Sequence, residues 1–132
     1  METGIEVDPT GVLNSFFRTC GAHNSSGMKV DDDEWHHLAV TADSFGITQY
    51  VDGISTAHEI GDVLTPSALG WRLGIPVANM YKSSGQIDDL AFFNVALEED
   101  DIQTLMNRGL KVSAAVDVSG KLTTTWSAIK AR

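Results

Sequence analysis

The feature that most constrains the fold is the run from Trp35 to Thr41, which reads Trp-His-His-Leu-Ala-Val-Thr. It begins an alternating β-type pattern that we interpret as a buried strand over residues 35–43. A Tyr-Val-Asp-Gly segment follows and ends at Gly53. Asp52-Gly53 is typical of a tight hairpin turn, because such turns need residues that tolerate positive φ. The two segments together predict antiparallel strands joined by short turns.

Turn signals recur along the chain at short intervals, which indicates an all-β meander. Asp8-Pro9-Thr10-Gly11, Ser44-Phe45-Gly46 and Asp52-Gly53 each combine residues that favour turns. The small, polar stretch 21–27 is predicted to be a loop. The expected strands cover residues 4–8, 12–19, 28–30, 35–43, 47–51, 54–60, 69–75 and 86–94, the last of them with an apolar run suited to burial on both faces.

One short helix is expected near residues 98–108. Four consecutive acidic residues, 98–101, stand at its start, where the helix macrodipole favours negative charge. Ile102, Leu105 and Met106 recur at helical spacing, and Arg108 lies in the last turn. Gly109 is placed to end the helix.

Composition narrows the classes of function. A chain of 132 residues with 42% hydrophobic and 20% charged residues has room for one globular domain. Its net charge of −9 disfavours nucleic acid as a partner, because phosphates would be repelled. Surplus carboxylates suit calcium, although the same charge is equally explained by solubility.

The chain carries few signals about its location. Cys20 is the only cysteine, so no internal disulfide is expected. The first residues lack the basic and apolar regions of a signal peptide, and no apolar stretch is long enough to span a membrane. We therefore expect any export signal to lie on sequence outside this chain.

A second phrase, Gly85-Gln86-Ile87-Asp88-Asp89 continuing to Asn94, is followed by Ala96-Leu97-Glu98. Together with the Trp-His-His and Tyr-Val-Asp-Gly phrases, and in this order, it resembles the laminin-G-like members of the concanavalin A-like jelly-roll superfamily. The resemblance covers roughly residues 4 to 108. It implies an antiparallel two-sheet β-sandwich over residues 1–110, with residues 111–132 forming one or two further strands and a basic tail.

The resemblance also implies an unusual feature. Family domains usually open with strands ahead of the hairpin at residues 4–8, and no such strands precede it here. A sandwich without those strands would expose unpaired backbone groups along its edges. We therefore predict that the isolated chain associates with itself through edge strands.

Asp88 and Asp89 are the predicted metal ligands, since family members often hold a structural calcium beside this strand. Neighbouring strand residues point to opposite faces, so backbone carbonyls would have to complete the site. The alternative is that one of these carboxylates only hydrogen-bonds a loop. The acidic run 31–34 is better explained as a solvated turn. His36 and His37 face apart on a strand and do not suit a shared metal ion.

Recognition of a sugar requires an aromatic platform with planar polar groups beside it. Tyr81 is the preferred platform, while Trp71 and Trp35 are expected in the core. The predicted ligand-binding residues are Tyr81, Asn79, Lys82 and Arg72, with His23 and Asn24 as further candidates.

Catalysis is not expected. Some enzymes of the superfamily cleave glycans with carboxylates spaced two apart on one strand, and Glu6-Val7-Asp8 begins such a pattern. The next position of the pattern is Thr10, and Pro9 interrupts the strand, so the second glutamate that retaining hydrolysis needs is missing.

The sequence thus indicates a non-catalytic, secreted or cell-surface binding module. Its expected ligand is a carbohydrate or glycoconjugate, with a possible structural calcium. Two alternatives stay open: a protein–protein adhesion or scaffold module, and an accessory domain of a larger glycoside hydrolase or sialidase.

Overall fold

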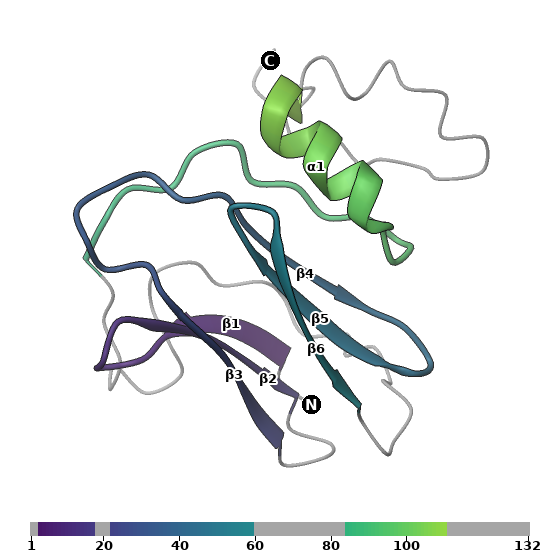
Figure 1. Ribbon diagram of the computed structural model, residues 1–132, viewed down its shortest axis with the longest axis horizontal. Coiled ribbons are helices and arrows are strands. Elements are labelled where there is room, and N and C mark those ends of the chain that lie inside the picture. The colour runs from purple at the N-terminus through teal and green to yellow at the C-terminus, as the bar shows by residue number, and fades with distance from the viewer. Residues whose placement is uncertain (1–2, 18–21, 60–83, 111–132) are drawn as a thin grey trace, which may run out of the picture.

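A computed structural model describes residues 3–17, 22–59 and 84–110 (Figure 1). Sheet A has the strand order β1-β2-β3 and sheet B the order β4-β5-β6, and all neighbouring strands are antiparallel. The elements are β1 (Thr3–Val7), β2 (Val12–Phe17), β3 (Ala22–Lys29), β4 (Leu38–Ala42), β5 (Gly46–Val51), β6 (Ile54–Glu59) and α1 (Glu99–Arg108). Two antiparallel sheets with one short helix confirm the predicted fold class.

The predicted hairpin turns form where their residues require them. Asp52 and Gly53 have φ of 51° and 81°, so both central residues of the β5–β6 turn adopt the left-handed conformation of a type I′ hairpin. Gly11, with φ of 82°, ends the turn between β1 and β2. The local sequence is sufficient to place these reversals.

Sheet B forms the middle layer of the molecule. Figure 1 shows sheet A on one side of it and α1 on the other. Because strand side chains alternate, Gln49 points toward sheet A, where its Nε2 atom lies 2.9 Å from Ser15 Oγ. The next residue, Tyr50, points the other way and packs with Leu97 and Ile102. The two faces of one strand therefore serve two different interfaces.

The space between the two sheets contains a buried polar network. Gln49 and Ser15 are both 0% exposed. The Gln49 amide nitrogen also donates to the carbonyl oxygen of Asn24 at 2.9 Å, and its Oε1 lies 3.0 Å from Nε2 of His58. Pairing of these groups offsets the cost of burying them and ties β2, β3, β5 and β6 together.

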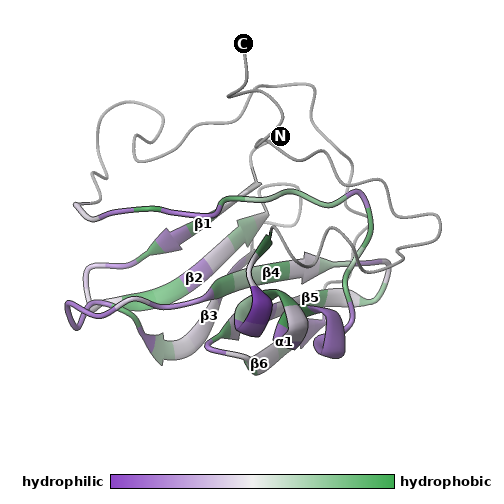
Figure 2. Ribbon diagram, turned by 90° about the horizontal axis from the view of Figure 1, so that it is seen from above, coloured by the Kyte–Doolittle hydropathy of each residue, from purple (hydrophilic) through white to green (hydrophobic). Residues whose placement is uncertain are grey.

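The helix follows its sequence signals closely. The Asp101 carboxylate accepts a hydrogen bond from the backbone N–H of Glu98 at 3.4 Å, and Gly109, at φ 71°, ends the helix. Ile102 is 2% exposed and faces sheet B, whereas much of the visible surface of α1 is hydrophilic (Figure 2). Among the described residues no helix has the length and apolar character needed to cross a bilayer.

The start of the Trp-His-His strand was predicted wrongly. The strand β4 begins only at Leu38, which pairs with Val51 at the end of β5. Residues 35–37 lie beyond the last residue of β5, where the chain already turns, so they have no strand partner there. Trp35 is consequently 66% exposed rather than part of the core.

The prediction of a doubly buried strand over residues 86–94 was also wrong. Asp89 has φ of 49°, which breaks an extended conformation, and its backbone N–H donates to Asp88 Oδ1 at 2.8 Å. Ile87 is 65% exposed. Only the end of the segment is covered, where Phe93 packs against the cluster around Tyr50.

The stretch predicted as a loop over 21–27 lies instead in the strand β3. Its small polar residues have little intrinsic strand preference, and pairing with β2 imposes the extended conformation. The register shifts between Val12 and Asn14, and Gly27 has φ of 72°, as expected of a bulge. The strand predicted over 69–75, including Trp71, and the tail 111–132 lie outside the described residues.

Candidate functional site

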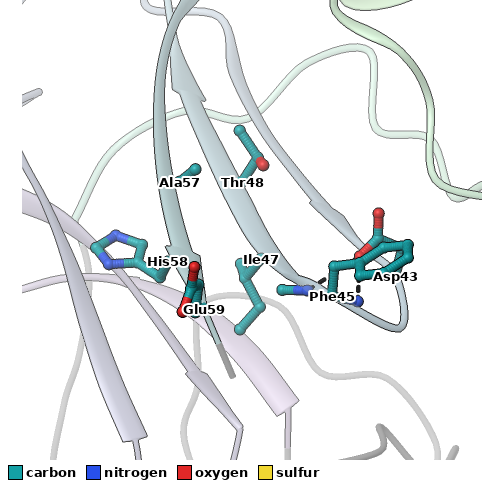
Figure 3. A pocket seen from close by; sticks show the side chains of 8 residues that line it. Asp43, Phe45, Ile47, Thr48, Ala57, His58 and Glu59 are labelled. Atoms are coloured by element: carbon teal, nitrogen blue, oxygen red, sulfur yellow. Dashed lines mark hydrogen bonds between the residues drawn. The ribbon is translucent and has the colours of Figure 1, made fainter. Parts of the chain in front are cut away.

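The candidate site is a hollow at the end of sheet B where the β4–β5 turn lies (Figure 3). It has an open volume of about 320 Å³. It is lined by Asp43, Phe45, Gly46, Ile47, Thr48, Ala57, His58 and Glu59. All of these residues belong to one hairpin or to the strand beside it, so the hollow is built from residues that are close along the chain.

The turn at the rim carries an exposed aromatic ring on a hydrogen-bonded backbone. The Asp43 carboxylate accepts hydrogen bonds from the backbone N–H groups of Phe45 and Gly46, at 2.7 and 3.0 Å (Figure 3). The Asp43 N–H donates in turn to the Gly46 carbonyl at 3.0 Å. Phe45 is nevertheless 83% exposed. A phenyl ring is thus held over solvent on a backbone that three hydrogen bonds fix.

The floor of the hollow is made by cross-strand pairs of β5 and β6. Thr48 pairs with Ala57, and Gly46 pairs with Glu59, so these four residues share the face of sheet B that is turned away from sheet A. Gly46 and Ala57 are small and leave space above the sheet. A Cβ atom at Gly46 would lie 2.3 Å from the carbonyl oxygen of His58, which means that a larger residue there would displace the strand.

The other face of the same strands anchors this floor. In Figure 3 the His58 side chain points away from Phe45 and Asp43, on the far side of β6. Its Nε2 atom contacts Gln49 in the buried network between the sheets. The hollow therefore lies on strands whose reverse side is fixed to sheet A.

The chemistry of the hollow is that of hydrogen-bond acceptors beside an aromatic ring. Asp43 and Glu59 contribute carboxylates, which only accept, and Thr48 contributes a hydroxyl that both donates and accepts. Among the described residues that line it there is no lysine or arginine. Such a site suits a ligand with hydroxyl or amine donors and an apolar face.

A second polar cluster lies around His36. Its Nδ1 atom is 2.7 Å from Asp52 Oδ2, and its Nε2 atom is 2.9 Å from Asp32 Oδ1. The hydrogen bonds with Asp52 and Asp32 raise the pKa of the ring above 6.5. Asp52 also accepts the backbone N–H of His37 at 2.9 Å.

We call this cluster the His36 clasp, comprising Asp32, His36 and Asp52. It joins the acidic turn before β4 to the β5–β6 hairpin. Since a carboxylate contacts each ring nitrogen, the histidine is fully engaged in holding the two turns. Within the described ranges no group of three or more histidine, cysteine, aspartate or glutamate side chains could hold a metal ion.

The residues predicted from the sequence to bind a ligand are not in the described part of the chain: Tyr81, Asn79, Lys82 and Arg72 all lie within 60–83. Of the further candidates, His23 and Asn24 lie on β3 and not on a loop. The His23 ring stacks on Phe16 with a centroid separation of 5.7 Å, and its Nδ1 is 3.4 Å from Glu6 Oε1. These two side chains lie on sheet A, apart from the hollow.

Asp88 and Asp89, the predicted calcium ligands, are both exposed in the segment that leads to α1. Asp88 Oδ1 accepts a hydrogen bond from the backbone N–H of Asp89. This agrees with the alternative prediction, in which one of the two carboxylates only hydrogen-bonds a loop. The described residues do not bring further carboxylates around the pair. An ion here would depend on backbone carbonyls or on residues outside the described ranges.

Asp8 is the second carboxylate of the glucanase-like spacing that Glu6 begins. Its side chain forms hydrogen bonds within the turn between β1 and β2. Its Oδ1 accepts hydrogen bonds from the N–H and hydroxyl of Thr10, at 2.7 and 2.6 Å, and from the N–H of Val12 at 3.1 Å. These bonds, the side-chain bond from Thr10 foremost, lower the pKa of Asp8 to about 2. A carboxyl group with that pKa is unsuited to donate a proton near neutral pH.

The sequence reasoning missed the hollow. A signal was present, since Phe45 is a large apolar residue in the middle of a turn between two strands. The residue types of Ser44-Phe45-Gly46 predict only a reversal of the chain. The outward direction of the ring follows from the turn geometry, which the pattern of residue types does not specify.

Comparison with known proteins agrees with this architecture. The family described as the concanavalin A-like lectin/glucanases superfamily matches residues 3–103. No curated protein and no solved structure matches the chain. Since the match spans more than half of the 132 residues, the chain belongs to this laminin-G-like family, and the resemblance inferred from the sequence is confirmed.

Proposed function

We propose that this member of the concanavalin A-like superfamily is a non-catalytic module that binds carbohydrate in the hollow beside Phe45. The observation that carries the proposal is an exposed phenyl ring on a hydrogen-bonded turn backbone, beside carboxylate and hydroxyl groups. A sugar ring has an apolar C–H face that stacks on an aromatic ring and hydroxyl groups that donate to carboxylates. A turn backbone that is already held by hydrogen bonds loses little further entropy when a ligand binds.

The proposal that the module is non-catalytic rests on Asp8 and Glu6. The Asp8 carboxylate is taken up by the turn between β1 and β2, and the Glu6 carboxylate lies 3.4 Å from His23. Retaining hydrolysis needs a second carboxyl group that can act as an acid. Neither side chain is arranged for that step.

Binding is tested by applying the chain to a glycan array and comparing it with Phe45→Ala. Loss of the aromatic platform should weaken binding of every retained sugar at least about tenfold, the equivalent of about 1.4 kcal/mol. Trp35→Ala is the matched control, because Trp35 is also an exposed aromatic residue but does not line the hollow. An array on which native protein binds nothing contradicts the proposal, as does equal loss in the two variants.

A second candidate function is a protein–protein adhesion or scaffold module. It is favoured by exposed apolar side chains on strands at the edges of the described sheets: Ile5 and Val7 on β1 are 53% and 40% exposed, and Leu38 on β4 is 38% exposed. Edge strands with apolar residues favour pairing with another chain. Light scattering over a concentration series tests this directly, and a monomer at every concentration would count against self-association.

Calcium is a separate proposal at Asp88 and Asp89, supported by family resemblance and by the acidic composition. A calorimetric melt with calcium and with a chelator tests it. A midpoint raised by calcium, and no longer raised in Asp88→Asn, supports the site. An unchanged midpoint removes both residues from the proposed calcium site.

We also propose a secreted or cell-surface location, because glycans and adhesion partners are abundant there. Fractionation of the producing cells tests this location.

A further inference from the structure

The described residues that line the hollow beside Phe45 include two carboxylates and no lysine or arginine. Its two ionisable carboxyl groups, on Asp43 and Glu59, stand at opposite sides of the small floor that Gly46 and Ala57 form. Asp43 Oδ1 is directed at the turn by two backbone N–H groups. Its other oxygen forms no hydrogen bond with a described residue, so the carboxylate retains capacity to accept from a ligand.

The lysine and arginine side chains of the described residues lie outside the hollow. Lys29 is 3.6 Å from Asp31 beside the β1–β2 turn, and Arg108 is in the last turn of α1. Neither lines the hollow. The net charge of −9 for the whole chain adds to the local negative potential.

These observations separate ligands by charge. A hydroxyl or ammonium group would donate to Asp43 or Glu59, and an ammonium group would also be attracted by the face of Phe45. A carboxylate or sulfate group on the ligand would approach two carboxylates, with no lysine or arginine among the described lining residues to compensate. Repulsion of this kind produces specificity by penalising the wrong ligand.

We infer that the hollow selects uncharged or amine-bearing sugars and rejects sugars that carry a carboxylate or sulfate group. This inference rests on the proposed function, since it names the class of sugar that the same site accepts. Phe45 provides an apolar contact that any sugar ring can make. Asp43 and Glu59 discriminate among sugars by their charge.

The test uses the full chain and matched pairs of immobilised sugars: glucose and glucuronic acid, galactose and its 6-sulfate, lactose and sialyllactose, with glucosamine added. We expect the neutral and amine-bearing members to bind, and each anionic partner to bind at least about tenfold more weakly. The ratio between the members of a pair is the quantity measured.

Glu59→Gln locates the effect, because it removes one charge while keeping the size of the side chain. The neutral-to-anionic ratio should fall several-fold in Glu59→Gln. Glu34→Gln is the matched control, since Glu34 is exposed in the acidic turn before β4 and does not line the hollow. Its ratio should stay at the native value.

The outcomes distinguish the inference from the proposed function. If no sugar binds, the proposed function fails and the inference with it. If neutral and anionic partners bind equally, the inference is overturned while carbohydrate binding stands. If Glu59→Gln and Glu34→Gln change the ratio equally, discrimination comes from overall charge, and selection by the hollow is again overturned.

Discussion

The two turns at the ends of β5 are built from the same local chemistry and serve opposite purposes. In each, an aspartate carboxylate accepts backbone N–H groups: Asp43 those of Phe45 and Gly46, Asp52 that of His37. The β5–β6 turn is covered, because Gln103 of α1 donates to the Gly53 carbonyl at 3.1 Å and the His36 clasp holds Asp52. Residue 45 on the β4–β5 turn is 83% exposed.

The comparison shows that a rigid turn becomes a structural anchor or a binding edge according to what packs on it. Because α1 contacts Gly53 and the acidic turn before β4 is joined to Asp52 through His36, stability should depend on that end of the hairpin. The other end can be altered at little cost to folding, and this is the end that carries the proposed site.

The largest expected effect comes from removing the cover over the anchored turn. Ile102 is 2% exposed and packs with Tyr50 and Leu97. Ile102→Ala should lower the free energy of unfolding by about 3 kcal/mol, the usual cost of truncating a buried isoleucine. Urea denaturation measures it. A loss below about 0.5 kcal/mol, the usual range for surface positions, would mean that α1 does not stabilise sheet B.

The next effect concerns Gly53 itself. Gly53→Ala should cost about 2 kcal/mol, because φ is 81° and a Cβ atom would lie 2.6 Å from Gln103 Nε2. Gly27→Ala is the control: its φ is 72°, but nothing lies within 4 Å of its Cβ position, so it should cost only about 1 kcal/mol. Equal losses in urea denaturation would show that the contact with α1 is unimportant.

A smaller effect is the pH dependence of the His36 clasp. The hydrogen bonds from Asp52 and Asp32 raise the pKa of His36, so its contribution is complete below the unfolded value of 6.5 and is lost as pH rises through the folded pKa. Burial opposes ionisation of Asp52, but the bonds from His36 and His37 outweigh it and lower its pKa from 3.8. Its contribution is therefore lost as pH falls through the lowered value.

The clasp should thus stabilise most between the unfolded pKa values of its aspartates and of His36, 3.8 and 6.5. Melting temperatures of native protein and His36→Asn across and above this range measure it. The variant isolates the clasp from His37, whose pKa burial lowers. We expect the difference between native and variant to shrink as pH rises from 6.5 through the folded pKa of His36. A constant difference would contradict the assigned role.

The smallest expected change in stability is at the exposed turn. Phe45→Ala should alter the free energy of unfolding by no more than about 0.5 kcal/mol, because the side chain is exposed. The same urea experiment measures it. A loss above about 1 kcal/mol would show that the ring contributes to folding, and the contrast between the two turns would fail.

Features set by neighbouring residues were predictable. Asp52-Gly53 tolerates positive φ and therefore forms the turn, and the acidic start with Gly109 at the end delimits the helix. Features set by pairing were not. The strand β3 takes its extended form from β2, and Trp35 is exposed because β5 ends at Val51 opposite Leu38. An apolar pattern alone does not show where a partner strand stops.

In the candidate site, too, some features follow from neighbouring residues and others from strand pairing. That Ser44, Phe45 and Gly46 form a turn was evident from their residue types. That the ring projects over a hollow, and that Asp43 and Glu59 flank it, depends on the register between β5 and β6.

The sequence by itself determined the three hairpin turns at residues 8–11, 44–46 and 52–53, where the helix begins and ends, and to which superfamily the chain belongs, because these depend on short stretches of residues. Only the tertiary structure decided which turn is covered and which is exposed. Burial depends on which distant elements pack on a face, and here α1 and the His36 clasp meet at one end of β5.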